Sequence, residues 1–248
     1  MMKRRIVVVT TLIGLMLSSG AAAAAPADNL TSRGEAVQAS AGPAAVVRLR
    51  VEGDTGTIFE DTVRTRGHNV TTVAGGTHQC DGTNNGANPS PGPTATGALD
   101  TASLQAGFTF DGPFDATFED FFISRVGGNT QTSTQFWGLL LNGSFTAVGG
   151  CQQRVQNNDE VLFAFDAFSK SHVLRLVGPA QVKVGLPAIY HVTDVQTGAP
   201  IAGADVNGVA SDASGNATLT FTAPTTLRVK ANRGDSIRSN AVVTRVRP

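Results

Sequence analysis

The 248-residue chain contains only two cysteines, Cys80 and Cys151, and it begins like an exported protein. A basic start at residues 3–5 precedes an apolar run at residues 6–16, and residues 25–27 have the Ala-x-Ala pattern of a signal-peptide cleavage site. In an oxidising compartment an even number of cysteines favours pairing. The sequence therefore predicts a Cys80–Cys151 disulfide, with two unrelated thiols as the alternative.

Residues 1–27 are predicted to be a signal peptide and residues 28–44 a flexible leader. Cleavage within residues 21–25 is one alternative, and a retained membrane anchor is another. However, the apolar run of roughly 15 residues is shorter than the ~20 residues that a spanning helix needs. We therefore expect a secreted, extracellular protein that has no membrane span after cleavage and that can associate with the cell surface.

Charge narrows the choice of partners. Cleavage after residue 27 leaves 16 Lys and Arg against 19 Asp and Glu, so the mature chain carries a net charge of about −3. No nucleic-acid partner is expected, because such a partner requires a clustered basic face. The expected partner is a small molecule, a glycan or a surface protein. The protein is expected to be a monomer, and no cofactor is expected.

Alternating residues predict that the first domain, residues 45–177, is built on strands. Val47, Leu49 and Val51 alternate with polar residues, and a returning strand follows at residues 57–65. The Asn142-Gly143 pair favours a tight hairpin turn. Further strands are expected at residues 109–110, 116–125, 135–141, 160–165 and 171–177.

Two other segments of this domain have different patterns. Residues 68–96 are rich in Gly, Pro and Asn and are expected to form a long surface loop. Apolar spacing at residues 98–106 predicts one short helix. The expected fold class is mainly β, and this domain is expected to be β-grasp-like α+β, with the helix covering one face of a sheet.

Gly178-Pro179 marks a predicted boundary, and the composition changes beyond it. Residues 179–248 contain short alternating runs at regular spacing, separated by turns rich in Gly, Pro, Asn and Asp. This spacing is typical of a β-sandwich. The second domain is therefore expected to be a small, Ig-like β-sandwich.

Several stretches of the first domain resemble a known family. Residues 136–143 read Phe-Trp-Gly-Leu-Leu-Leu-Asn-Gly, residues 148–151 read Val-Gly-Gly-Cys and residues 158–163 read Asn-Asp-Glu-Val-Leu-Phe. Together with the helix-like segment 98–102, they resemble the transcobalamin-like carboxy-terminal domain, a module of unknown function in bacterial surface proteins. Residues 179–248 look like a bacterial Ig-like module, and this resemblance implies a spacer or an adhesive unit.

No catalytic or metal-binding motif stands out in the sequence. Gly-x-Ser-x-Gly, His-Glu-x-x-His and a phosphate-binding loop do not occur. His68, His78 and Cys80 are close in sequence but lack a convincing fourth ligand for zinc. No metal site is predicted, and the chain is expected not to be an enzyme. Arg233-Gly234-Asp235 matches a minimal integrin tripeptide, but three residues recur by chance.

Trp137 is the only tryptophan and is the centre of the predicted ligand site. Because neighbours on a strand point to opposite faces, one of Phe136 and Trp137 is expected in the core. If Trp137 is exposed, it can form an aromatic and polar patch with Gln135 and Asn142. The sequence favours a core position for Trp137 over this exposed one.

The leading hypothesis is a secreted, non-catalytic binding or adhesion protein of the cell surface, whose first domain carries the ligand surface. One alternative is a secreted hydrolase or metal-dependent enzyme that uses the loop around Cys80. Another is a purely structural envelope protein. The sequence does not identify the ligand.

Overall fold

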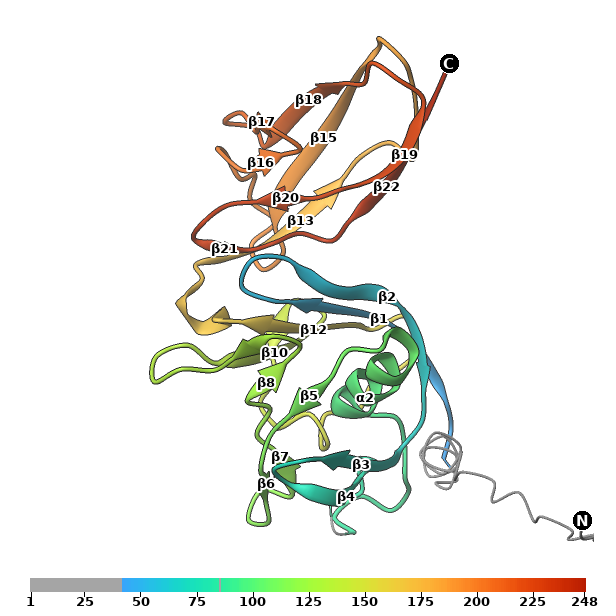
Figure 1. Ribbon diagram of the computed structural model, residues 1–248, viewed down its shortest axis with the longest axis vertical. Helices are drawn as coiled ribbons and strands as arrows, with labels where there is room; N and C mark the ends of the chain where they lie inside the picture. The colour runs from blue at the N-terminus through green and yellow to red at the C-terminus, as the bar shows by residue number, and fades with distance from the viewer. Residues whose placement is uncertain (1–41, 85) are drawn as a thin grey trace, which may run out of the picture.

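The computed structural model describes residues 42–84 and 86–248, which are mainly β, with one α-helix and several sheets. Figure 1 shows two bodies stacked along the long axis. The predicted signal peptide and most of the predicted leader lie outside the described residues. Among the described residues, no helix has the length and apolar character needed to cross a membrane.

A five-stranded sheet forms the side of the first body that faces the second body (Figure 1). In spatial order its strands are β11 (Ser144–Phe145), β10 (Trp137–Leu141), β12 (Glu160–Phe165), β1 (Ala45–Glu52) and β2 (Thr57–Thr65). β1 pairs parallel with β12 and antiparallel with β2. β2 and β12 have the bounds that the sequence predicts.

The two faces of β1 have opposite characters. Val47, Leu49 and Val51 are fully buried in the core of the first body, as their alternation predicts. The other face carries Arg50 and Glu52, yet these side chains are only 3% and 2% exposed. The second body covers them, so the sheet meets it through a row of charged residues.

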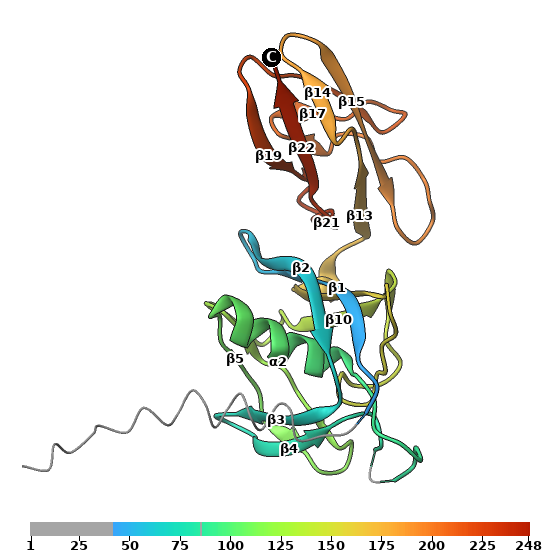
Figure 2. The ribbon, with the colours of Figure 1, turned by 90° about the vertical axis from the view of Figure 1, so that its right-hand side faces the viewer.

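The single described α-helix, α2 (Ala95–Ala106), lies against the opposite face of the five-stranded sheet (Figure 2). It begins earlier than the sequence predicts because Thr94 caps it: the Thr94 Oγ1 atom accepts a hydrogen bond from the Gly97 N–H at 3.1 Å. It ends at Gly107, whose positive φ of 73° suits glycine. Residues 95–103 of the helix are buried.

Residues 68–80 form a hairpin, where the sequence predicts the start of a long loop. Its strands are β3 (His68–Thr72) and β4 (Gly76–Cys80), and Cys80 is bonded to Cys151 as predicted. The hairpin was missed because its buried positions include polar side chains, His68 and Thr72. His68 is paired with helix α2, since its Nε2 atom lies 3.1 Å from the Asp100 Oδ2 atom.

Residues 110–130 form short two-residue ladders. The strand predicted at residues 116–125 does not form as one element, because a turn occupies residues 116–119 and residues 122–124 have no strand pairing. The ladders comprise β5 (Phe110–Asp111), β6 (Phe114–Asp115), β7 (Asp120–Phe121), β8 (Arg125–Val126) and β9 (Asn129–Thr130).

The second body contains several small sheets around one core. One sheet has the order β18 (Asn216–Thr220), β15 (Pro187–Asp194), β13 (His172–Val177) and β21 (Ser236–Ile237). Another has β14 (Gln181–Lys183), β22 (Val242–Arg247) and β19 (Thr225–Val229), and a third has β17 (Val209–Ala210), β16 (Asp205–Val206) and β20 (Ala231–Asn232).

Tyr190 links two of these sheets. Its side chain is fully buried, and its hydroxyl lies 2.7 Å from the Thr244 Oγ1 atom, so a β15 residue is bonded to a β22 residue. β13 pairs with β15 and β21 of this body, whereas the sequence predicts residues 171–177 in the first domain. Alternation marked the strand but carried no information on its partners.

An apolar cluster holds the two bodies together. Leu140, Leu162 and Ala164 of the first sheet, with Ala167 of the 3-10 turn η1 (Ala167–Ser169), pack in one cluster with Val173 and Ile237 of the second body. These residues lie on the same side of the sheet as Arg50 and Glu52. The contact between the bodies is therefore partly apolar and partly ionic.

Candidate functional site

Trp137 lies at the start of β10 and is only 8% exposed. Its indole N–H donates a hydrogen bond to the Asn129 carbonyl at 3.2 Å, and its ring packs edge-on against Phe165 with 5.5 Å between ring centres. Both interactions fix the orientation of the ring. The structure therefore places Trp137 in the core, the position that the sequence favours.

Gln135 and Asn142 do not join Trp137 in one patch. Asn142 occupies the hairpin turn at the far end of β10, roughly 16 Å along the strand from Trp137 at ~3.3 Å per residue. Its side chain donates to Asp159 Oδ1 and accepts the Glu160 N–H, both at 2.9 Å. Gln135 is engaged through its backbone in a turn with Thr132.

A cavity of about 140 Å³ lies beside Trp137. Its walls are mostly apolar, and the exposed side chains of Phe122 and Val148 also line it. The other apolar walls come from Phe121, Ile123, Trp137, Leu139 and Phe163. Sequence patterns could not reveal this cavity, because its walls come from separate segments that meet only in the fold.

Thr96 lines the same cavity at the start of α2. Its hydroxyl is buried against Gly150 and has no hydrogen-bond partner among the described residues. Thr101, one turn and a half further along the helix, differs because its hydroxyl donates to the Gly97 carbonyl at 2.8 Å. The two threonines form a matched pair on one buried helix.

Thr96→Val should raise the free energy of unfolding by about 1 kcal/mol, because valine keeps the shape and removes an unsatisfied polar atom. Thr101→Val should lower the same free energy by about 1–2 kcal/mol, because it breaks a buried hydrogen bond. Urea unfolding of both variants checks the prediction. Equal losses of stability in the two variants would show that the Thr96 hydroxyl is satisfied in solution.

Asp120 supports the turn that carries Cys151. Its carboxylate accepts hydrogen bonds from the Cys151 N–H at 2.9 Å and from the Gln152 N–H at 3.3 Å. Burial raises the pKa of Asp120 to about 6 and outweighs these bonds, which lower the pKa. Asp120 is therefore a buried carboxyl group between the disulfide and the Trp137 cavity.

Stability should depend on pH through Asp120. Between about pH 4 and pH 6 the folded protein retains a proton that the unfolded chain has released, so the contribution of Asp120 to stability decreases as the pH rises through this window. The decrease is at most about 3 kcal/mol. The stability of Asp120→Asn relative to the wild type should rise between pH 4 and pH 7, as measured by urea unfolding. The same difference at every pH would contradict the assignment.

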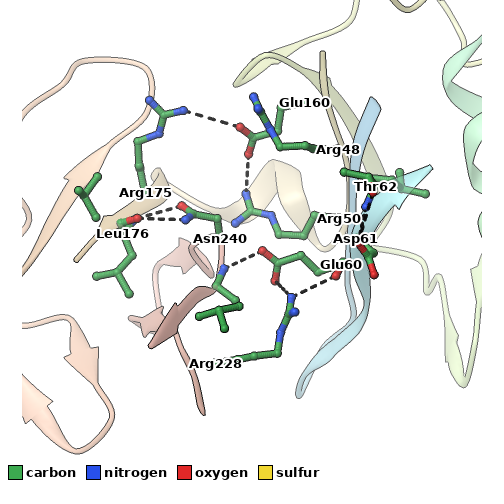
Figure 3. Close-up of a pocket in the computed structure, with 14 residues that line it drawn as sticks. Arg48, Arg50, Glu60, Asp61, Thr62, Glu160, Arg175, Leu176, Arg228 and Asn240 are labelled. Carbon is green, nitrogen blue, oxygen red and sulfur yellow. Dashed lines mark hydrogen bonds and ion pairs between the residues drawn. The ribbon is translucent and has the colours of Figure 1, made fainter. Parts of the chain in front are cut away.

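A second and larger cavity, about 450 Å³, lies between the two bodies (Figure 3). Arg48, Arg50 and Glu160 line it from the sheet of the first body, and Arg175 and Arg228 line it from the second body. Sequence alternation predicted Arg48 and Arg50 on the polar face of a strand, but nothing in the pattern indicated that a second body would enclose that face.

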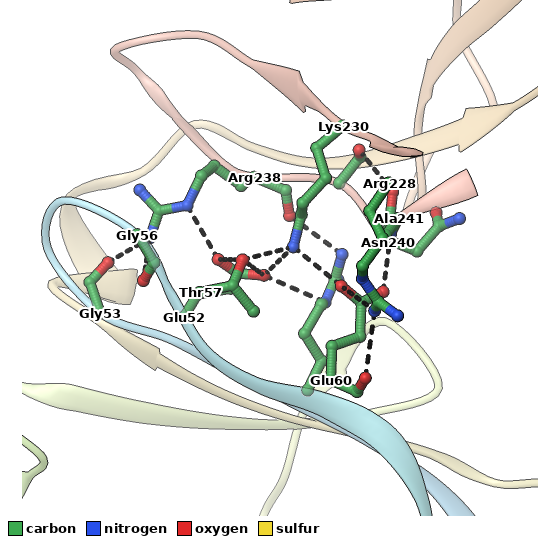
Figure 4. Close-up of polar contacts among 12 residues, drawn as sticks. Glu52, Gly53, Gly56, Thr57, Glu60, Arg228, Lys230, Arg238, Asn240 and Ala241 are labelled. Carbon is green, nitrogen blue, oxygen red and sulfur yellow. Dashed lines mark hydrogen bonds and ion pairs between the residues drawn. The ribbon is translucent and has the colours of Figure 1, made fainter. Parts of the chain in front are cut away.

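A network of ion pairs between the two bodies lies beside this cavity (Figure 4). The buried Glu52 carboxylate accepts hydrogen bonds from Lys230 Nζ at 2.5 Å and from Arg238 Nε at 2.8 Å. Lys230 also donates to Glu60 at 3.0 Å. Burial acts to raise the pKa of Glu60, but Lys230 and the Ala241 N–H outweigh it, so this pKa is lowered.

The residues considered for zinc are engaged elsewhere. His68 binds Asp100, Cys80 forms the disulfide, and the His78 ring is stacked on Phe114 with 3.6 Å between ring centres. Within residues 42–84 and 86–248, no three His, Cys, Asp or Glu side chains group as a metal site. In the Arg-Gly-Asp turn, both Asp235 carboxylate oxygens bind Arg233, at 2.7 and 3.0 Å.

Comparison with known proteins identifies one matching segment. A family model described as a domain of unknown function, DUF4430, matches residues 97–167. No curated protein matches the chain. The matched segment begins within α2 and ends at Ala167, the first residue of η1, and it contains every residue that lines the Trp137 cavity except Thr96.

Proposed function

We propose that this protein is a secreted, non-catalytic binding protein of the cell surface, and that the Trp137 cavity receives an apolar group of its ligand. The first body carries the site. The second body, which we propose to be an Ig-like sandwich, holds it at a fixed orientation as a spacer. The transcobalamin-like resemblance and a β-grasp-like arrangement of the first body belong to this proposal.

The observation that supports the proposal is an apolar cavity lined partly by exposed apolar side chains. Phe122 and Val148 are 52% and 43% exposed, so the apolar surface continues from the cavity to the outside. A cavity of about 150 Å³ with aliphatic and aromatic walls can take up benzene. The Trp137 cavity is similar in size, which favours an aromatic or branched aliphatic group on a small molecule or surface protein.

The two alternatives receive less support from the described residues. The candidate hydrolase or metal-dependent enzyme required His68, His78 or Cys80, and these side chains already have partners. A purely structural envelope role would leave the apolar cavity without an occupant. The cavity therefore favours a binding protein.

Trp137 makes the test direct, because it is the only tryptophan and lines the cavity. The mature full-length protein is titrated with benzene, cobalamin and cell-wall glycans, and its tryptophan emission is recorded. At least one compound should change the emission with saturation, and Val148→Glu should weaken that response by at least tenfold. Val209→Glu, an exposed valine on the second body, should not weaken it. The proposal is wrong if no compound changes the emission, or if both variants behave alike.

A further inference from the structure

Three guanidinium groups surround one carboxylate in the cavity between the bodies (Figure 3). Glu160 lies opposite Arg48 in the parallel pairing of β1 and β12. One Glu160 carboxylate oxygen is 3.7 Å from Arg50 Nη2, and the other is 3.8 Å from Arg175 Nη2. At these distances the groups attract each other but are not hydrogen-bonded.

The three arginines have unused hydrogen-bonding capacity. Arg50 is 3% exposed, and its only hydrogen bond among the described residues is the one that Nη1 donates to the Arg238 carbonyl at 3.0 Å. Its Nε atom is buried, has no hydrogen-bond partner there and lies 3.9 Å from the Glu52 Oε1 atom. The Arg48 and Arg175 side chains are exposed to solvent and donate no hydrogen bond to a described residue, so Arg50 is the buried cation of the three. A buried cation with so few acceptors is costly unless an anion completes its surroundings.

Two carboxylates at the cavity or beside it, Glu60 and Glu52, already have cationic partners. Glu60 binds Lys230 at 3.0 Å and lies 3.4 Å from Arg228 Nη2, so Arg228 is engaged. Glu52 binds Lys230 and Arg238. Four arginines (Arg48, Arg50, Arg175 and Arg228) and three carboxylates (Glu60, Asp61 and Glu160) line the cavity, so positive charge is in excess by one.

From this geometry we infer that the cavity between the bodies binds a small organic anion, through a carboxylate or phosphate group held by Arg48, Arg50 and Arg175. Planar guanidinium groups match the oxygen geometry of both anions. Leu176 and Val243 also line the cavity and offer apolar contact to the rest of the molecule. A cavity of about 450 Å³ has the size of small-molecule sites, which often lie between domains.

Glu160 has a defined part in this site. Its carboxylate is near the same two arginines that the ligand would contact, so it competes with the bound anion. Its side chain accepts no hydrogen bond from a described residue, and its strand pairing depends on the backbone. Removing its charge should therefore tighten anion binding without disturbing the sheet. This site is independent of the Trp137 cavity, so either proposal can fail alone.

The test titrates the full-length mature protein with phenyl phosphate by calorimetry, at low ionic strength to limit screening. Phenyl glucoside, which is neutral and carries the same ring, is the matched ligand control. We expect phenyl phosphate to bind saturably and phenyl glucoside not to bind. Arg48→Gln and Arg175→Gln should each weaken phenyl phosphate binding by about tenfold, which corresponds to one charge-assisted hydrogen bond. Glu160→Gln should strengthen it by a similar factor.

Arg247→Gln is the matched protein control, because Arg247 is exposed at the outer end of β22 and does not line the cavity. Its affinity for phenyl phosphate should equal that of the wild type. The inference is wrong if phenyl phosphate shows no saturable binding up to about 10 mM, a concentration that would reveal even a very weak site. It is also wrong if Arg48→Gln and Arg175→Gln leave the affinity unchanged, or if Glu160→Gln weakens binding. Arg50 is left unchanged because its burial makes a folding defect the expected result.

Discussion

Replacing Glu52 with Gln should lower the free energy of unfolding by about 3–5 kcal/mol. The Glu52 side chain is 2% exposed and receives hydrogen bonds from Lys230, Arg238 and Thr57. Without its charge, Arg238 would lose its carboxylate partner and Lys230 would keep only Glu60, so Arg50, Lys230 and Arg238 would lie close together with one carboxylate fewer. Breaking a buried ion pair by removing one partner leaves an uncompensated charge, and this accounts for the large cost.

Thermal and urea unfolding of Glu52→Gln measure this effect, and Asp54→Asn is the matched control. Asp54 is exposed two residues further along the same hairpin, and its side chain binds no described residue, so its loss should change stability by less than about 0.5 kcal/mol. Glu52→Gln combined with Lys230→Gln should cost less than the sum of the single changes. Similar small losses for Glu52 and Asp54 would contradict the role assigned to the network.

Removing the disulfide should destabilise the protein by roughly 4 kcal/mol. Cys80 and Cys151 are separated by 71 residues, and a cross-link over a loop of this length strongly restricts the unfolded chain. It also joins the β3–β4 hairpin to the turn that Asp120 supports. Cys80→Ala with Cys151→Ala should show the loss in urea unfolding.

Reduction of the wild type with dithiothreitol provides the control for the disulfide prediction. The reduced wild type should lose nearly as much stability as the double alanine variant, because both lose the same cross-link. A double variant that is much less stable than the reduced protein would assign the effect to packing, since both sulfur atoms lie in the core. Unchanged stability after reduction would contradict the prediction.

Local patterns were sufficient for part of the fold. The alternation in β1, the Asn142-Gly143 turn and the helix α2 were all predictable, because each depends on a few neighbouring residues. Asn142 and Gly143 have the positive φ values of 51° and 86° that such a turn needs. The disulfide followed from the expected compartment and from the presence of only two cysteines.

The missed features depend on residues that are far apart in the chain. The polar face of β1 suggested solvent exposure, yet the second body buries Arg50 and Glu52. Trp137 was recognised as important, but the cavity beside it is formed by segments between Thr96 and Phe163. The arginines of the larger cavity come from β1, β13 and β19, and sequence spacing cannot predict their approach.

The parallel pairing of β1 with β12 also has a consequence for how the protein is made. This pairing places residue 48 opposite residue 160, so neighbouring strands of the first sheet come from its earliest and latest segments. Contacts between such distant segments slow folding, because a large loop must close first. A chain that emerges from its amino-terminal end cannot complete this sheet until β12 is available. We therefore expect the first body to fold late during synthesis or translocation, and fragments that end before residue 160 to remain sensitive to proteases.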